Sequence, residues 1–296
     1  MNTFTYKLTN NDIKKTEEFF KNEKCTFSEQ QYAFFKAVSK DYSASLYNSG
    51  KLVIQGKEIS NIVEKFCKYM NIEFETDKKN TDEEITAENY IGVDESGKGD
   101  FFGPLVIAGV AVNPALKKMF TDIGIKDSKQ LDDEKISKLA KEVQKNSKWS
   151  VVVINPQKYN ELYGKFKNLN KLLAWGHARV IENILEKAPE CNLALSDKFA
   201  KDDKVIENAL MVKGRQIKMV QKTKGEEDIA VAAASVVARA EYVSRMKSMS
   251  NSYKINFPKG ASDKVIQCGN DYITKYGKER LNEVAKLHFK TTANFI

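Results

Sequence analysis

Two adjacent carboxylates, Asp94 and Glu95, end a short apolar run that begins at Tyr90. Such a run is typical of a buried strand. Acids at the end of a buried strand are costly unless a cation neutralises them. The usual occupant is a hard divalent ion such as Mg²⁺, which binds through oxygen ligands. We therefore expect a divalent-cation site at this strand end.

A glycine-rich turn with one lysine, Ser96-Gly97-Lys98-Gly99, follows the two acids and leads to a second apolar run over residues 104–112. Its glycine spacing matches neither of the common nucleotide-binding loops, and the preceding acids would repel a bare phosphate. On these residues alone, a second interpretation is also possible: a tight hairpin whose two acids are simply solvated. The positions of other acids in the chain distinguish a cation site from a solvated hairpin.

Further acids stand at two places where partners for Asp94 and Glu95 are expected. Asp197 follows a short strand expected at 193–195, and Glu226, Glu227 and Asp228 open a long apolar helix, where negative charge is favoured. Helical spacing places Glu226 above the apolar stripe of this helix, so it is the inward candidate. Glu227 and Asp228 stay open as alternatives.

An acid set without cysteine or histidine favours magnesium chemistry. The only histidines are His177 and His288, too few for a histidine-based metal site or triad. Three or four converging acids suit two Mg²⁺ ions about 4 Å apart, which activate water and stabilise the leaving oxygen in phosphodiester cleavage. The formal net charge of +8 and pI near 9.0 favour a nucleic-acid partner. Composition does not separate DNA from RNA.

The length of 296 residues suits two unequal domains. Residues 1–74 predict a small β-α-β-β-β-α domain, 75–89 a polar linker, and 90–296 an α/β domain around a mixed sheet flanked by helices. Strands are expected at 90–93, 105–112, 149–154, 193–195 and 216–220, with helices from about 131 to 144, 156 to 187, after Gly225, and 263 to 286. Ser128 is expected to cap the first of these helices.

Cysteine usage and hydropathy bear on the compartment. Cys25, Cys67, Cys191 and Cys268 are far apart with no C-x-x-C pair, as in reduced cytosolic proteins. The N-terminus lacks a signal pattern, and no apolar run approaches membrane-spanning length. We expect a soluble cytoplasmic protein with no membrane contact.

The acid-bearing stretch resembles a known family. Asp94-Glu95-Ser96-Gly97-Lys98-Gly99-Asp100-Phe101-Phe102-Gly103-Pro104-Leu105 is similar to the signature of ribonuclease HIII. The related ribonuclease HII typically carries alanine, arginine and proline where this chain has Ser96, Lys98 and Asp100. Supporting matches are Asp127-Ser128-Lys129-Gln130-Leu131, the run from Ala232 to Arg239, and Lys286-Leu287-His288-Phe289. The resemblance covers residues 90–296.

The resemblance implies an RNase H-like catalytic fold preceded by a TBP-like domain that grips the substrate. It implies Mg²⁺- or Mn²⁺-dependent endonucleolytic cleavage of the RNA strand of RNA/DNA hybrids, leaving 3′-hydroxyl and 5′-phosphate ends. The family's four metal-binding acids correspond to Asp94, Glu95, Asp197 and an acid at the start of the alanine-rich helix, for which Glu226 is our choice. Substrate contacts are implied for the turn and one downstream pair: Ser96, Gly97, Lys98, Gly99, Ser128 and Lys129.

Two rival functions remain at this stage. One is ribonuclease HII activity at single ribonucleotides in DNA, against which Lys98 and Asp100 argue. The other is a hybrid-binding protein without catalysis, against which the complete acid set argues. We expect a monomeric enzyme with an RNA/DNA hybrid as its partner.

Overall fold

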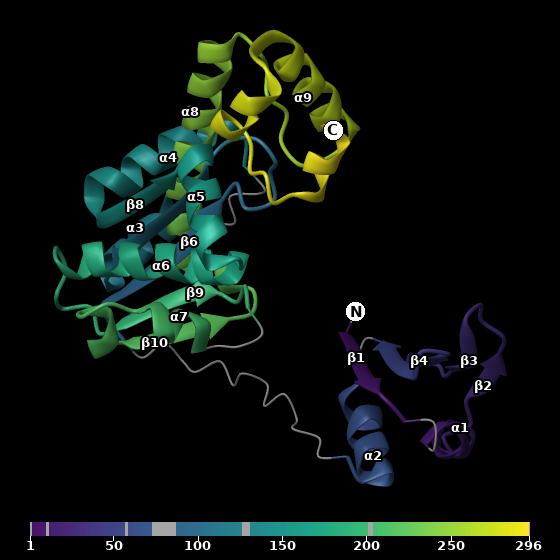
Figure 1. Cartoon of the computed structure of the whole chain (residues 1–296). Helices are drawn as coiled ribbons and strands as arrows, with labels where there is room; N and C mark the ends of the chain where they lie inside the picture. Colours follow the sequence, from purple (N-terminus) through teal and green to yellow (C-terminus); the bar gives the residue numbers. More distant parts are fainter. Residues whose placement is uncertain are drawn as a thin grey trace. The chain divides into compact units, whose positions relative to one another are not determined.

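The computed structural model describes residues 2–9, 12–56, 59–72, 87–125, 131–200 and 204–295. Ser128 and Lys129, expected to contact substrate, lie outside these residues. The chain divides into two compact units, Met1–Glu84 and Ile85–Ile296 (Figure 1). Each unit has its own hydrophobic core.

The first unit is a five-stranded antiparallel sheet with two helices on one face. The elements are β1 (Asn2–Lys7), α1 (Ile13–Asn22), β2 (Thr26–Ser28), β3 (Ala33–Val38), β4 (Tyr42–Tyr47), β5 (Lys51–Gly56) and α2 (Ser60–Met70), in the sheet order β1-β5-β4-β3-β2. Alternate strand residues such as Leu46 and Leu52 pack against Phe20 and Phe66 of the helices, as the period-2 side-chain geometry requires. The α+β prediction is confirmed. The three-residue β2 was missed because it has a single apolar residue.

The second unit is built on a mixed five-stranded sheet in the order β10-β9-β6-β7-β8. Its strands are β6 (Tyr90–Ser96), β7 (Leu105–Val112), β8 (Lys148–Ile154), β9 (Leu193–Asp197) and β10 (Lys218–Lys222). Its α-helices are α3 (Pro114–Asp122), α4 (Asp133–Asn146), α5 (Pro156–Phe166), α6 (Leu169–Leu185), α7 (Lys204–Ala209), α8 (Ile229–Tyr253) and α9 (Asp263–Tyr276). The strands β6, β9 and β10 are parallel, whereas β7 is antiparallel to both neighbours.

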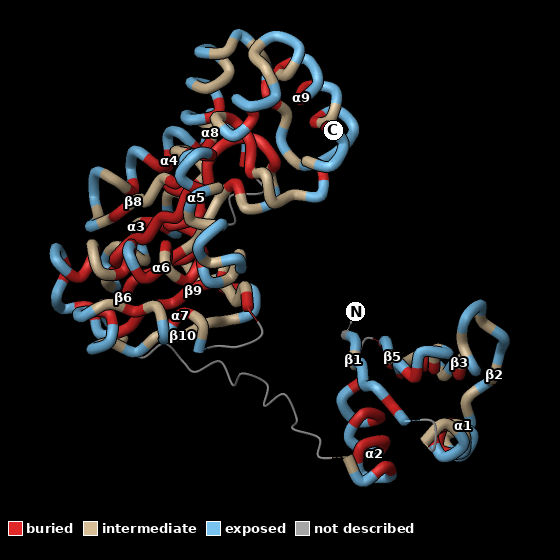
Figure 2. Tube along the Cα trace, in the orientation of Figure 1, coloured by how far each residue is buried: buried red, intermediate tan, exposed pale blue. Residues whose placement is uncertain are grey.

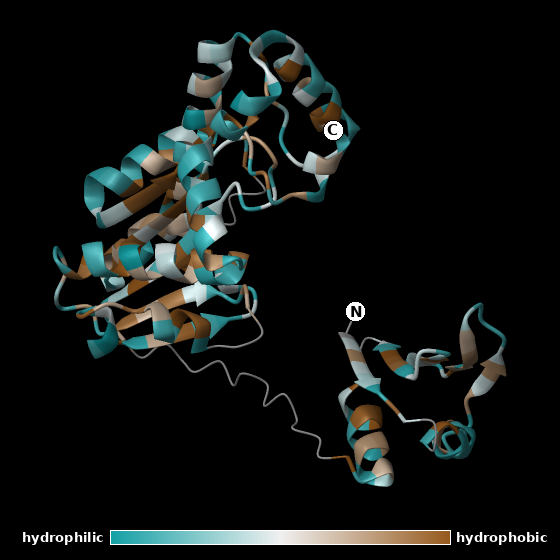
Figure 3. Ribbon diagram, in the orientation of Figure 1, coloured by the Kyte–Doolittle hydropathy of each residue, from teal (hydrophilic) through white to brown (hydrophobic). Residues whose placement is uncertain are grey.

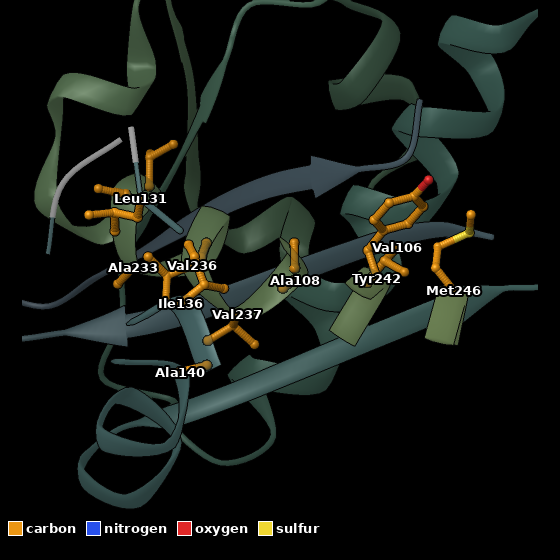
Figure 4. Close-up of a cluster of buried hydrophobic side chains, with 14 of the residues drawn as sticks. Val106, Ala108, Leu131, Ile136, Ala140, Ala233, Val236, Val237, Tyr242 and Met246 are labelled. Atoms are coloured by element: carbon orange, nitrogen blue, oxygen red, sulfur yellow. The ribbon is translucent and has the colours of Figure 1, made fainter. Parts of the chain in front are cut away.

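Helices cover both faces of this sheet. Val106 and Ala108 of β7 face a core shared with α3, α4 and α8, whereas Leu105 and Ile107 face a core shared with α5, α6 and α7. Figure 4 shows Val106 beside Tyr242 of α8, and Val236 and Val237 of the same helix near Ile136 and Ala140 of α4. The buried core follows the sheet in Figure 2. This three-layer arrangement confirms the predicted mixed sheet flanked by helices.

The small residues of α8 let it lie unusually close to the sheet. A Cβ atom on Gly92 of β6 would stand 2.2 Å from the backbone carbon of Ala230. Only glycine allows the first turn of α8 to approach β6 this closely, at a point two residues before Asp94. The helix is thereby held beside the acidic strand end.

Two helix starts differ from the sequence prediction. Helix α8 begins at Ile229 with Asp228 as its N-cap, so Glu226 and Glu227 lie in a preceding 3₁₀ turn, Gly225–Glu227, and not on the helix. Helix α4 begins at Asp133, and Asp132 caps it by accepting from the Lys135 amide at 2.8 Å. The prediction that Ser128 caps α4 is therefore wrong. Helices α3 and α7 were not predicted.

Apolar residues concentrate on the strands of the second unit (Figure 3). Among the described residues, none of the helices combines the length and the apolar character that crossing a membrane requires.

Candidate active site

The parallel pairing of β6 and β9 brings Asp94 and Asp197 together. Val93 lies opposite Ser196 in the last register pair, and each aspartate follows by one residue. Neighbouring strands lie about 4.8 Å apart. Leu195 packs into the core that contains α8, so Asp197, two residues on, faces the same side. Asp94 faces that side too, because its carboxylate is hydrogen-bonded to Ser235 of α8.

The surroundings of Asp94 oppose its ionisation. Burial raises the pKa of its carboxyl to about 7, and the negative charges of Glu95 and Asp197 add to the shift. The hydrogen bonds from Ser235 and the Glu95 amide act in the opposite direction. The net effect is a local excess of negative charge, as expected where a cation belongs.

Glu95 points to the opposite face of the sheet from Asp94, because successive strand residues alternate. Its Oε2 lies 3.1 Å from Nε2 of His177 on α6, and its Oε1 accepts from Lys98 Nζ at 3.2 Å. Burial alone would raise the pKa of Glu95, but His177 and then Lys98 outweigh it and lower the pKa to about 2. The two adjacent acids therefore reach the strand end from opposite faces of the sheet, close enough for the charge of Glu95 to raise the pKa of Asp94.

The 3₁₀ turn before α8 lies directly against Asp197. The Gly225 amide donates to Asp197 Oδ1 at 3.0 Å, and a Cβ on Gly225 would stand 2.8 Å from the Asp197 Cα. Glu226 is the next residue and is half-buried. Within the described parts of the chain Glu226 makes no hydrogen bond or ion pair. Its carboxylate therefore has no competing partner there, and the backbone of its turn lies against Asp197.

The neighbouring acids of this turn have other partners. Glu227 is exposed and paired with Lys224 at 3.2 Å. Asp228 caps α8 through Oδ1, which accepts from Ala230 at 2.8 Å, while its Oδ2 accepts from the Tyr90 hydroxyl at 2.8 Å. The geometry thus favours Glu226 among the three because of its place in the 3₁₀ turn, and not because of the predicted helical face.

The turn that follows the acids requires glycine at Gly97. Its φ is +83°, and a Cβ there would stand 2.4 Å from the Pro104 carbonyl and 2.7 Å from the Tyr242 ring. A Cβ on Gly99, by contrast, would meet no atom within 4 Å, and the φ of Gly99 is ordinary. The turn is therefore packed on one side and open around Gly99 and Lys98.

Two residues from the C-terminal part of the chain, Gly260 and Lys286, form hydrogen bonds with the end of the glycine turn. Gly260 accepts from the Phe101 amide at 2.9 Å and donates to the Asp100 carboxylate. The fully buried Lys286 ammonium donates to the Asp100 carbonyl at 2.7 Å. Burial lowers the pKa of Lys286 to about 7, although the charge of Asp100 opposes the shift. Residues distant in sequence thus fix the turn beside Asp94 and Glu95.

The donor set fits a hard divalent cation. Asp94, Asp197 and Glu226 offer only carboxylate oxygens, which suit Mg²⁺ or Mn²⁺. Across the described residues, however, no three His, Cys, Asp or Glu side chains converge into a ready-made cation cluster. The hydrogen bond between Glu95 and His177 on the other face of the sheet is one reason why the Glu95 carboxylate lies apart from the other acids.

His177 is the functional candidate that sequence reasoning missed. It is fully buried and lies on a helix stripe whose other buried members are apolar, so a chain with only two histidines gives no local reason to single it out. The signal in the sequence that could have indicated a role for His177 is a single histidine on an otherwise apolar helix stripe. Its acidic partner is 82 residues away in sequence, and no local pattern connects the two.

Comparisons with known proteins agree over nearly the whole chain. Residues 91–292 match the family described as Ribonuclease HII, and residues 3–80 match a domain family of unknown function, DUF3378. The ribonuclease HIII of Protochlamydia amoebophila (strain UWE25) is 40% identical, with 96% of this chain and 94% of that protein covered. The ribonuclease HIII of Chlamydia felis (strain Fe/C-56) is 42% identical, with 89% and 87% covered.

A solved structure is similar over both units. The crystal structure of Bst-RNase HIII in complex with Mn²⁺ has a TM-score of 0.66 at 24% identity and covers 99% of this chain and 97% of that one. Shared fold along the full length, together with about 40% identity to ribonucleases HIII over most of both chains, leads to one conclusion: the chain belongs to the ribonuclease HIII family.

Proposed function

We propose that this ribonuclease cleaves the RNA strand of RNA/DNA hybrids endonucleolytically, leaving 3′-hydroxyl and 5′-phosphate ends. The observation that carries the proposal is the side-by-side placement of Asp94 and Asp197 on one face of the sheet, with the Glu226 turn against Asp197. This arrangement offers oxygen ligands to divalent cations. The similarly folded Bst-RNase HIII was crystallised with Mn²⁺.

Asp94, Glu95, Asp197 and Glu226 are the proposed metal ligands, and Mg²⁺ or Mn²⁺ the proposed cofactor. Bound divalent cations supply the charge that activates water and stabilises the leaving oxygen. Asp94 and Asp197 would hold the cations from the α8 side, and Glu95 would complete the set around the strand end while orienting the attacking water. Asp94 must release its proton to bind a cation, since a carboxylic acid is a poor ligand.

Substrate contact is proposed for the turn Ser96-Gly97-Lys98-Gly99. The open space at Gly99 lets a ribose 2′-hydroxyl approach the backbone, and this hydroxyl distinguishes RNA from DNA. The side chain of Lys98 is 37% exposed, so it can reach a phosphate. Ser128 and Lys129 stay proposed phosphate contacts from the sequence resemblance alone.

The enzyme is further proposed to act as a cytoplasmic monomer. Its four cysteines, Cys25, Cys67, Cys191 and Cys268, are free thiols, which suits a reducing compartment. A sedimentation measurement with and without hybrid tests the monomeric state.

The direct test uses a labelled RNA/DNA hybrid with Mg²⁺, Mn²⁺ or excess EDTA. Cleavage of the RNA strand in the presence of either ion, abolished by EDTA, is expected. A duplex DNA with one embedded ribonucleotide serves as the second substrate and should be cut poorly. Equal or faster cleavage of that second substrate would favour ribonuclease HII-like activity, and cleavage that survives EDTA would contradict the metal mechanism.

A further inference from the structure

A buried histidine contacts the Glu95 carboxylate from the face of the sheet opposite Asp94. His177 has no exposed surface, and its Nε2 lies 3.1 Å from Glu95 Oε2. Its neighbours on the buried stripe of α6 are apolar, among them Ala174, Ala178 and Ile181. The ring also packs on Phe199, with centroids 5.0 Å apart.

The chemistry of the two side chains determines which one donates the hydrogen bond between His177 and Glu95. An ionised carboxylate only accepts hydrogen bonds, so His177 Nε2 carries the hydrogen and donates it to Glu95. The other ring nitrogen, Nδ1, has no hydrogen-bond partner within the described portion of the chain. A leucine would fill this apolar site without leaving a buried polar atom unpaired. The hydrogen bond to Glu95 is therefore what explains why this buried position holds a histidine and not an apolar residue.

The two oxygens of Glu95 are held differently. Oε2 is fixed from inside by the fully buried His177, whereas Oε1 is paired with the partly exposed Lys98 at the solvent edge. The inner contact is made by a side chain that has no exposed surface. The outer contact is made by a long side chain that can leave when a cation or substrate arrives.

We infer that His177 is a positioning residue, which clamps Oε2 of Glu95 and thereby presents Oε1 to the catalytic cation. This inference rests on the proposed metal-dependent function. Hydrogen-bond partners of this kind orient metal-binding carboxylates, and their loss typically weakens metal affinity by about 10–100-fold. No role in proton transfer is required of His177, since its side chain has no exposed surface with which to touch substrate.

The test measures Mn²⁺ affinity in the absence of nucleic acid, by titration calorimetry on the full-length protein. The His177→Gln variant keeps a donor where Nε2 stood, whereas His177→Asn places its amide near the Nδ1 position and leaves Glu95 without a donor. His177→Leu fills the space with no donor. His288→Phe is the control, because His288 is likewise packed among aromatic rings with an unpaired Nδ1 but does not contact Glu95.

The expected result is a loss of about 10-fold or more in Mn²⁺ affinity for the Asn and Leu variants. His177→Gln should lie within about 3-fold of wild type, as should His288→Phe, with unfolding midpoints recorded to confirm that each variant is folded. If His177→Asn folds and binds Mn²⁺ as tightly as wild type, the positioning role is overturned while the proposed function stands. If the unmodified protein binds no Mn²⁺, the proposed cation site fails and this inference fails with it.

Discussion

Asp94 and Asp197 occupy matching positions on two neighbouring parallel strands, each one residue beyond the pair Val93 and Ser196. Their proximity follows from the register of the sheet and not from any loop conformation. A register shift of one residue would turn either side chain to the other face. The placement of these two proposed ligands is therefore set by the register of the sheet.

Glu226 and Glu227 are adjacent acids with different surroundings, so they form a matched pair for mutagenesis. Glu226→Gln should lower the cleavage rate about 100-fold, since losing a ligand that holds the cation costs about 2.7 kcal/mol of transition-state stabilisation. Glu227→Gln, which removes only an exposed pair with Lys224, should stay within about 3-fold of wild type. Initial rates on one hybrid at saturating Mg²⁺ make the comparison. The reverse ranking would assign the fourth ligand to Glu227.

Gly225 permits the 3₁₀ turn to lie against Asp197. Gly225→Ala should push the turn away, because its Cβ would stand 2.8 Å from backbone atoms of Asp197. We expect a destabilisation of about 1–3 kcal/mol and a loss of activity that excess Mg²⁺ only partly restores. Gly164→Ala in α5, with no atom within 4 Å, is the control and should be neutral or slightly stabilising. Unchanged activity in Gly225→Ala would show that the position of this turn does not matter.

Gly99 tests whether the turn meets the substrate. Alanine fits at Gly99 without a clash and without backbone strain, so Gly99→Ala should leave the melting temperature unchanged. It should nevertheless raise KM for the hybrid, because a methyl group would stand between the backbone and the ribose hydroxyl. Gly97→Ala, where φ is +83° and the space is filled, should lower stability as well. Wild-type KM in Gly99→Ala would remove the turn from the proposed substrate contacts.

The raised pKa of Asp94 predicts a pH-dependent stability of the metal-free protein. The folded-state pKa is about 7 against an ordinary 3.8, so the unfolded chain loses this proton first as pH rises. The stabilising contribution is complete below about pH 4 and is lost as pH rises through about 7. Asp94→Asn has no proton to lose, so its unfolding midpoint should exceed that of wild type at pH 8 by more than at pH 5.

Thermal unfolding of the full-length protein in EDTA at the two pH values measures this difference. Glu227→Gln, at an exposed position, should follow wild type at both. Added Mg²⁺ should stabilise the wild type at pH 8 and not Asp94→Asn. A constant offset between Asp94→Asn and wild type across the pH range would contradict the raised pKa.

Much of this arrangement was predictable from sequence, because the local signals are strong. The apolar runs before Asp94 and Asp197 predicted both strands, and the alanine-rich run after Gly225 predicted α8. The alternation of side chains along β6 gives the two acids different surroundings, which the prediction of a single converging acid set did not include. Adjacent residues on a strand face opposite sides, so Asp94 and Glu95 approach the strand end from opposite faces of the sheet.

Other features depended on contacts between distant residues. Asp228 can cap α8 only because the chain turns at Gly225, and its second oxygen is taken by Tyr90, 138 residues away in sequence. The same holds for Lys286 at the Asp100 carbonyl and for His177 at Glu95. Burial and tertiary pairing give these residues their roles, and neither is encoded in local spacing.

The most direct measurement compares cleavage and binding in Asp94→Asn and Asp197→Asn on one labelled RNA/DNA hybrid. Each variant should bind the hybrid within about 3-fold of wild type, since neither aspartate is proposed to hold the substrate except through the cation. RNA-strand cleavage in Mg²⁺ should fall by about 1,000-fold or more, several kcal/mol in the barrier. Turnover near the wild-type rate in either variant would contradict the assignment of this strand pair as the catalytic centre.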